Sequence, residues 1–270
     1  ACHCEDEKII KANIAAYREE YGVTIDPAFH PLIRSREAAI ASSETAVGLA
    51  RHGGARLHLL HLSTAEETQL LTPGADPAAK QITGEACVHH LWFDDSSYAS
   101  KGNLVKWNPP VRSAADREAL LSAVRKGLID VIATDHAPHT LEEKSAPYFK
   151  APSGGPTVQH SLVMMLELCH RGELNPELVV RKMCHNPALL FGITDRGFVR
   201  EGYKADLVLV DPAAPWTVNK GNILYKCGWS PLEGTTFRSS VITVFANGVP
   251  VFEEGGLTGR RAPEMLRFKR

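Results

Sequence analysis

The stretch DVIATDHAPHT, residues 130–140, places a carboxylate and two histidines directly after an apolar run. Side chains alternate between the faces of a strand, so Asp135 is predicted to share the inward face with Ala133. His61 ends a second apolar run, and His3 lies in what could be a third strand. Three such ligands with one open position are typical of catalytic zinc, whose bound water has a pKa of about 7 and could give its proton to Asp135. The plainer interpretation is three solvated polar residues at strand ends.

Helical and strand-like patterns alternate over most of the chain. Ser35 and Ser113 are predicted N-caps of two helices, because each precedes an apolar periodic segment with early acidic residues. Strands separated by helices indicate βα units around a parallel sheet, with chemistry at the carboxyl ends of the strands. The predicted helices are residues 5–22, 35–54, 64–71, 113–127, 156–172 and 176–192, the predicted strands are 55–63, 80–88 and 128–134, and residues 93–103 are predicted to be a loop.

The pattern changes near Phe198, where strand-rich segments follow one another without a helix between them. Asn247–Gly248 is a strong signal for a tight β-hairpin. We therefore predict two domains: residues 1–195 form an α/β domain and residues 196–270 form a small β-rich domain.

Composition excludes few classes of protein. The 270 residues include 30 basic and 31 acidic side chains, so the formal net charge of −1 gives no general reason to expect nucleic acid or an anionic membrane as partner. No apolar stretch approaches the roughly 20 residues that cross a bilayer. Six irregularly spaced cysteines are typical of reduced thiols in a cytoplasmic protein. Cys2, His3 and Cys4 could form a zinc site, but no second pair lies at zinc-finger spacing.

Several segments carry a family resemblance. ATDHAPHTLEEK resembles the last-strand signature of dihydroorotases, in the amidohydrolase superfamily. ACHCED, HLLHLST and GEACVHHLWF resemble that family's fifth, sixth and seventh strands, KWNPPVR the segment between strands seven and eight, and NPALLFGI with GYKADLVLVD the return to an outer β domain. The resemblance implies the C-terminal half of a (β/α)8 TIM-type barrel plus part of a small outer β domain.

Residue roles follow from this resemblance only at matching positions. It makes His3 and His61 ligands of one metal ion, and Asp135 a ligand of the other and the general acid/base. It places Asn108 against the pyrimidine ring, His139 on the substrate carboxylate and the backbone around Gly154 in the ring pocket. The family's HxH pair and its bridging lysine or aspartate are not in this sequence. We therefore expect the chain to be the second half of a longer polypeptide, with a fragment that needs a partner as the alternative.

The resemblance implies a zinc-dependent, cytoplasmic dihydroorotase. Such an enzyme interconverts N-carbamoyl-L-aspartate and L-dihydroorotate in pyrimidine synthesis, with one or two Zn²⁺ ions, and the family suggests a homodimer. A hydantoinase or an allantoinase is the nearest alternative, although those enzymes tend to vary the TDHAPH and NPPVR segments. A catalytically silent scaffold that binds a partner enzyme is the alternative from another class.

The remaining histidines are expected to have structural roles. His89 and His90 are predicted to face opposite sides of a strand, so that both cannot bind one ion without a kink. We therefore expect packing or supporting roles for them, and likewise for His136. The histidines expected on the surface or on helices are His30, His52, His160, His170 and His185.

Overall fold

The computed structural model describes residues 1–74 and 76–269, and the contacts among them define two compact units. The first unit contains residues 1–74, 80–161 and 223–231, and the second contains residues 76–79, 162–222 and 232–269. These units group segments by contact. The predicted division at residues 195 and 196 concerns the domains of the fold and stays a prediction.

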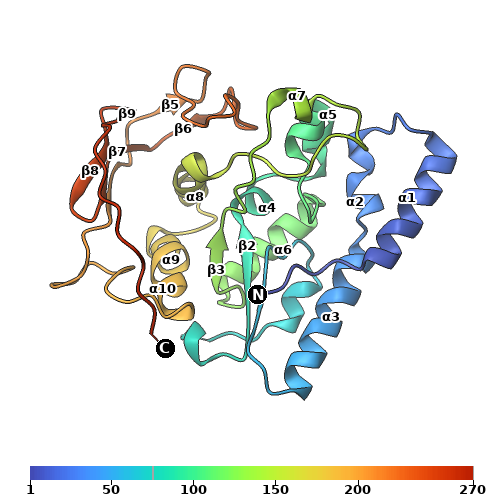
Figure 1. Cartoon of the computed structure of the whole chain (residues 1–270), viewed down its shortest axis with the longest axis horizontal. Helices are drawn as coiled ribbons and strands as arrows, with labels where there is room; N and C mark the ends of the chain where they lie inside the picture. Colours follow the sequence, from blue (N-terminus) through green and yellow to red (C-terminus); the bar gives the residue numbers. More distant parts are fainter. Residues whose placement is uncertain (75, 270) are drawn as a thin grey trace. The chain divides into compact units, whose positions relative to one another are not determined.

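The first unit contains a parallel sheet, of which Figure 1 labels the strands β2 and β3. Its strands, in the order β1-β2-β3, are β1 (Leu57–Leu59), β2 (Ile82–Cys87) and β3 (Val131–Ala133). Leu59 pairs with Gly84, and Cys87 pairs with Ala133. Parallel strands that neighbour one another in chain order are the winding of a (β/α) barrel, so the α/β prediction is confirmed. The predicted half barrel stays a prediction.

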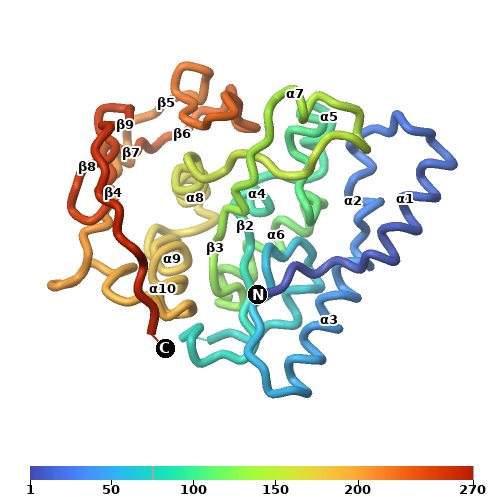
Figure 2. The backbone as a smooth tube through the Cα atoms, viewed as in Figure 1, coloured from blue at the N-terminus to red at the C-terminus, as the bar shows by residue number. Residues whose placement is uncertain are grey.

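The N-terminal segment extends this sheet at one point. Figure 2 shows it leaving the side of the sheet and running to the first helix. Cys2 forms a parallel bridge with Leu59, and its N–H and C=O bond the backbone of His58 and Leu60 at 2.9 and 3.1 Å. His3 is therefore held next to the end of β1.

The helices of the first unit begin where the sequence provides caps. The hydroxyl of Ser35 accepts a bond from the N–H of Ala38, and that of Ser113 accepts one from Asp116, so both predicted N-caps are confirmed. All six residues of β2 are buried, as expected for a parallel strand covered on both faces. The helices are α1 (Glu7–Tyr21), α2 (His30–Ile33), α3 (Arg36–His52), α4 (Val88–Trp92), α5 (Tyr98–Lys101), α6 (Ala114–Arg125) and α7 (Leu141–Lys144).

The second unit contains helices and antiparallel sheets. Asn247 and Gly248 have φ angles of +50° and +80° between paired strands, which confirms the predicted hairpin. The helices that follow α7 are α8 (Ser161–His170), α9 (Pro176–Val180), a π-helical turn (Arg181–His185) and α10 (Asn186–Leu190). The strands β4 (Leu207–Asp211), β7 (Ser240–Ala246), β8 (Val249–Glu253) and β9 (Gly256–Leu257) form one sheet, and β5 (Trp216–Thr217) pairs with β6 (Thr236–Phe237).

Two local predictions differ from the structure. The helix predicted over residues 64–71 is only a 3-10 turn, Glu67–Leu70. The buried carboxylate of Glu67 accepts bonds from the N–H groups of Ser63 and Thr64, which holds the preceding residues in a turn. The loop predicted over residues 93–103 contains short helical turns, and Asp94 caps the first of them through the N–H of Ser96.

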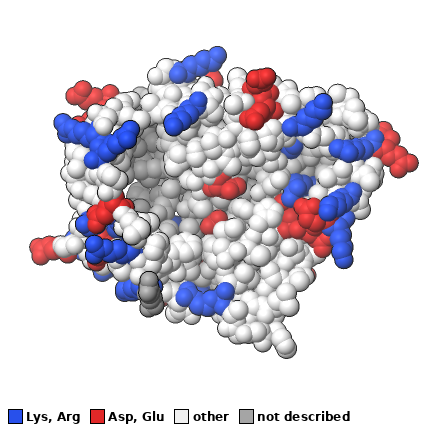
Figure 3. Space-filling model, viewed as in Figure 1, with Lys and Arg blue, Asp and Glu red and all other residues white. Residues whose placement is uncertain are grey.

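The surface carries charged side chains of both signs, in line with the formal net charge of −1. On the face shown in Figure 3, basic and acidic side chains are interspersed. Among residues 1–74 and 76–269, no helix combines the length and the apolar character needed to span a bilayer.

Candidate active site

Two of the predicted ligands lie at strained positions beyond strand ends. His61 and Asp135 each come two residues after their strands, β1 and β3. Their φ angles are +35° and +43°, in the left-handed region that non-glycine residues seldom adopt. Such a conformation costs on the order of 1 kcal/mol or more and is concentrated at functional sites. The backbone therefore redirects both side chains at the carboxyl edge of the sheet.

The structure brings His3 and His61 together. Nδ1 of His3 lies 3.0 Å from Nε2 of His61, and the rings meet edge to face with centroids 4.7 Å apart. The other nitrogen of His61, Nδ1, is buried without a hydrogen-bond partner. Two imidazole nitrogens, one from the N-terminal segment and one from the residues after β1, thus converge as a pair of donors suited to a divalent metal ion.

A buried carboxylate, that of Glu5, orients the His3 ring. Nε2 of His3 lies 2.9 Å from Oε2 of Glu5, and Arg34 binds the same carboxylate through Nε and Nη2 at 2.9 and 2.6 Å. Burial raises the pKa of Glu5, but the bonds from His3 and Arg34 outweigh it and bring that pKa down to about 2. A proton on Nε2 of His3 leaves the Nδ1 lone pair directed at His61, as in carboxylate–histidine–metal arrangements.

Sequence reasoning missed Glu5 and Arg34. Glu5 lies two residues after His3, so strand alternation alone would have placed both on one face. The contact with Arg34 spans 29 residues and has no local signal. The supporting half of this site is therefore only partly visible in the sequence.

Asp135 is exposed and less tightly placed than the two histidines. Burial and the neighbouring His3 lower the pKa of His61, and the charges of Asp135 and Glu85 oppose that shift. Asp135 is therefore within electrostatic reach of His61. Among the residues that the structure describes, His3, His61 and Asp135 do not bring their ligand atoms within 4.8 Å of one another as a set of three.

Three backbone segments carry the predicted substrate-binding residues Asn108, His139 and Gly154. The N–H of Gly154 bonds the carbonyl of Lys106 at 2.9 Å, and the N–H of Ala137 bonds the carbonyl of Gly155 at 3.3 Å. The segments before Asn108 and His139 are thereby joined through the glycine loop. The Asn108–Pro109 peptide bond is cis, and Oδ1 of Asn108 is buried without a hydrogen-bond partner.

The two glycines of this loop are needed for close packing. Gly154 has a φ of +115°, and a Cβ on it would lie 2.6 Å from the carbonyl oxygen of Ala137. A Cβ on Gly155 would lie 2.8 Å from the ring of Trp107. The close approach of backbone expected here is therefore made to Ala137 and Trp107 within the protein.

Two buried lysines fix the same loop, and sequence reasoning missed both. Nζ of Lys144 donates to the carbonyl oxygens of Lys106, Pro152 and Gly154 at 3.2, 2.9 and 2.8 Å. Nζ of Lys106 donates to two further loop carbonyls. Burial lowers the pKa of Lys144 to about 7 and that of Lys106 to about 8. These cations bind backbone oxygens that would otherwise be buried without partners.

A cavity of about 200 Å³ lies beside Asn108. Arg34, Lys106 and His30 contribute its polar wall, and side chains of α1 contribute apolar atoms. His61 and Asp135 are not among the residues that line it. The cavity therefore provides a partly cationic space on the Asn108 side of the candidate site.

His30, expected on the surface or on a helix, lies on a helix and is buried. It begins α2, with Nδ1 2.7 Å from the hydroxyl of Tyr148 and Nε2 2.7 Å from the carbonyl of Trp107. Burial lowers the pKa of His30 to about 3. A neutral His30 thus anchors the residue that precedes Asn108.

The predicted substrate ligand His139 is half-buried. Its Nδ1 lies 3.8 Å from the carboxylate of Glu143, and its carbonyl accepts a bond of 2.8 Å from the indole of Trp229. Nδ1 of His136 accepts the N–H of Thr157 at 3.0 Å, which agrees with the supporting role expected for it.

The prediction that His89 and His90 face opposite sides of a strand is wrong. β2 ends at Cys87 and α4 begins at Val88, so both histidines lie in a helical turn. Their ring centroids are 4.2 Å apart. Alternation across a strand therefore does not keep the two rings apart.

Comparisons with known proteins agree with this geometry. The sequence pattern of the "Amidohydrolase family" matches residues 38–251. The chain is 42% identical over 202 residues to a dihydroorotase of Halobacterium salinarum, covering 74% of this chain and 46% of the relative, and 36% identical over 209 residues to a dihydroorotase of Pyrococcus furiosus, covering 77% and 48%. An allantoinase of Bacillus velezensis is 32% identical over 257 residues, covering 95% and 56%.

A solved structure has the same fold. The L-hydantoinase (dihydropyrimidinase) of Arthrobacter aurescens aligns with a TM-score of 0.86 and 28% identity, over 94% of this chain and 57% of that protein. The chain spans about half the length of the curated relatives it matches. The predicted resemblance is thus confirmed, and this chain belongs to the amidohydrolase family.

Proposed function

We propose that this chain acts in a metal-dependent cyclic amide hydrolase, a dihydroorotase. The reaction is the reversible closure of N-carbamoyl-L-aspartate to L-dihydroorotate. The observation that carries the proposal is the convergence of His3 and His61 at the strand edge, with Asp135 in electrostatic reach. The dihydroorotases among the relatives, at 42% and 36% identity, support this substrate class.

His3 and His61 would hold one metal ion. Glu5 fixes the protonated nitrogen of His3, and His61 presents a second nitrogen at 3.0 Å, so the residues present fit a Zn²⁺ ion. When bound, such an ion supplies Lewis-acid polarisation of a carbonyl and lowers the pKa of water. Asp135 would be a ligand on the other side of the site.

Asp135 would also move the proton. Its exposed carboxylate follows β3, at the edge where the histidines lie. In the hydrolytic direction it takes a proton from the attacking water and gives it to the ring nitrogen as the amide bond breaks. General acid/base catalysis of this kind contributes about 10²–10⁴-fold to a rate.

The loop network would position the substrate. Asn108 offers an unpartnered amide oxygen beside the cavity, and the backbone around Gly154 is joined to it through Lys106. His139 would donate a hydrogen bond to the substrate carboxylate, which suits an anionic ligand. A homodimer and a cytoplasmic location belong to the same proposal.

A second cyclic amidase activity is the alternative. The allantoinase of Bacillus velezensis aligns with 95% of this chain at 32% identity. A panel of dihydroorotate, hydantoin and allantoin, assayed with the full-length protein, separates these substrates. Turnover of allantoin or hydantoin alone would replace the dihydroorotase assignment.

Asp135→Asn is the test of mechanism. The change removes the base but keeps a residue that tolerates a positive φ, so turnover should fall at least about 100-fold in a folded protein. Asp195→Asn is the matched control, because Asp195 is also exposed and has a φ of +60°. Near-normal turnover by Asp135→Asn would contradict the role. Absence of turnover in the unmodified full-length protein would favour the silent scaffold.

A further inference from the structure

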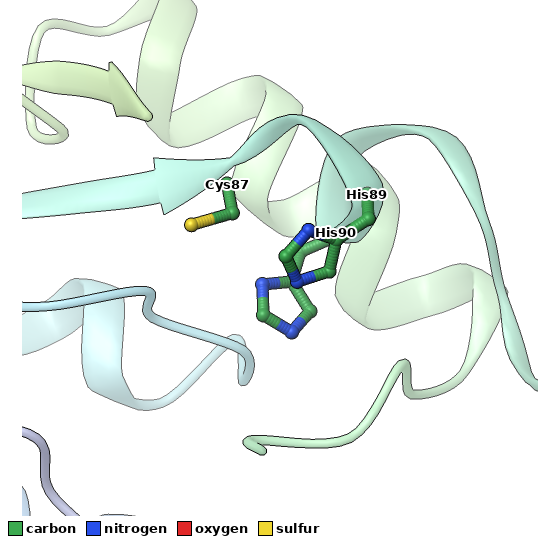
Figure 4. A group of neighbouring side chains, drawn as sticks. All are labelled: Cys87, His89 and His90. Carbon is green, nitrogen blue, oxygen red and sulfur yellow. The ribbon is translucent and has the colours of Figure 1, made fainter. Parts of the chain in front are cut away.

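A second group of metal-binding side chains lies where β2 passes into α4. Cys87 is the last residue of the strand, and His89 and His90 occupy the first turn of the helix (Figure 4). One ligand atom from each residue lies within 4.8 Å of the others, and all three residues are at most 3% exposed. Among the described residues, this is the one such group of histidine, cysteine and acidic side chains.

The ligand atoms of these side chains have unused lone pairs. Nε2 of His90 lies 3.0 Å from the carbonyl of Pro109, so the proton is on Nε2 and the lone pair is on Nδ1. That Nδ1 has no hydrogen-bond partner, and neither ring nitrogen of His89 has one. The carbonyl of Thr134 interacts with the His89 ring but does not meet hydrogen-bond geometry. A buried polar atom left without a partner is unfavourable, and a bound ion would relieve that cost.

The tautomer of His90 is the one that a ligand needs. Metal-binding histidines almost always donate their other N–H to a carbonyl or carboxylate, which fixes the ring and its lone pair. The Pro109 carbonyl does this for His90 in the structure. Cys87 adds a free, buried thiol that would give its proton to solvent as a sulfur–metal bond forms.

The spacing is close to that of a bound ion. With metal–nitrogen bonds of about 2.0–2.1 Å and a metal–sulfur bond of about 2.3 Å, tetrahedral ligand atoms lie roughly 3.4–3.6 Å apart. The three ligand atoms of Cys87, His89 and His90 lie within 4.8 Å of one another, so they must move by about 1 Å to reach these separations. Small side-chain rotations provide such shifts. Thiolate with imidazole selects soft and borderline ions.

We propose that Cys87, His89 and His90 bind a soft or borderline transition-metal ion, of the class of Zn²⁺ or Cu⁺. This group shares no residue with the one proposed at His3, His61 and Asp135, and it lies within electrostatic reach of His61 and Asp135. The ring of His89 stacks on Trp107 with centroids 4.3 Å apart and an angle of 13°. A bound ion would thus join the end of β2 to the segment that precedes Asn108.

Cobalt(II) is the probe. The full-length protein is produced with Co²⁺ in the growth medium, because burial requires that the ion be present while the chain folds. A thiolate ligand gives Co²⁺ an intense near-ultraviolet charge-transfer absorption, which imidazole and carboxylate ligands do not give. The ligands proposed for the active site include no thiolate, so this absorption reports a cysteine ligand, and the cysteine variants assign it.

The variants assign the sulfur. The absorption should be present in the unmodified protein and in Cys4→Ser, and lost in Cys87→Ser. Cys4 is the matched control, because it is also buried and lies next to His3. Absence of the absorption in the unmodified protein, or its persistence in Cys87→Ser, overturns the proposal. Loss of the absorption in Cys4→Ser also overturns it, because the thiolate ligand would then belong to the N-terminal segment.

A second measurement requires no variant, in case Cys87→Ser does not fold. X-ray absorption at the zinc edge of the unmodified protein, isolated with zinc, should show sulfur at about 2.3 Å. Zinc surrounded only by nitrogen and oxygen in this protein overturns the proposal. Turnover is not the readout, so failure of this proposal and failure of the dihydroorotase assignment are distinguishable.

Discussion

Acid should destabilise the protein through His30, and the size of the effect can be worked out. His30 is buried between Tyr148 and Trp107, and burial lowers its pKa from 6.5 to about 3. Below pH 6.5 the unfolded chain binds a proton on this histidine, whereas the folded chain does not until about pH 3. The free energy of unfolding therefore falls as the pH decreases through this window.

At pH 4 the solution is about 2.5 pH units below the unfolded pKa of 6.5 and still above the folded pKa of about 3. The unfolded imidazole is therefore fully protonated, and the folded one is largely neutral. At about 1.4 kcal/mol per unit, His30 lowers the free energy of unfolding by ~3 kcal/mol relative to pH 7. His30→Gln removes the titration. The advantage of the unmodified protein over this variant should therefore shrink by ~3 kcal/mol between pH 7 and pH 4.

Urea unfolding followed by tryptophan fluorescence at several pH values measures this difference. The other buried histidines titrate in both proteins, so their contributions cancel. His52→Gln is the matched control, because His52 is exposed at the end of α3. A difference between the unmodified protein and His30→Gln that stays constant from pH 7 to pH 4 would refute the reasoning.

Three further predictions test the surroundings of the site. Gly154→Ala places a Cβ 2.6 Å from the carbonyl of Ala137 at a φ of +115°, so the KM of the proposed substrate should rise or the melting temperature should fall; an unchanged variant contradicts the packing. Glu5→Gln removes the charge behind His3 and should weaken zinc binding about 10–100-fold in a chelator competition, whereas an exposed glutamate of α1 changed in the same way should not. Asp130→Ala removes the buried carboxylate that pairs with the largely covered Lys80 and should lower the free energy of unfolding by about 3–5 kcal/mol in urea; a loss below 1 kcal/mol would show that the pair is dispensable.

The sequence was sufficient where short-range patterns decide the structure. The apolar runs before His61 and Asp135 predicted that each residue would lie near a strand end, and local polar residues predicted the caps at Ser35 and Ser113. The Asn247–Gly248 turn follows from the left-handed backbone that these two residues tolerate. Each of these features depends on residues within a few positions of one another.

Features that depend on distant contacts were not predictable in this way. Lys144 donates to carbonyls of a loop that only the tertiary fold closes around it, and nothing in TLEEK marks this role. His89 and His90 were placed on a strand because the segment from Cys87 to Trp92 has no glycine, proline or capping residue at its boundary. Strand and helix are both compatible with such a short apolar segment.

The positive φ angles of His61 and Asp135 have a consequence for engineering this protein. At both positions the backbone alone would be more stable with glycine or asparagine. A directed-evolution campaign scored only on heat resistance would thus favour replacements at the proposed metal ligand His61 and at the proposed acid/base Asp135. Selection for thermostability should therefore keep these two codons fixed. The strained backbone at both positions lowers stability at the residues on which the proposed activity depends.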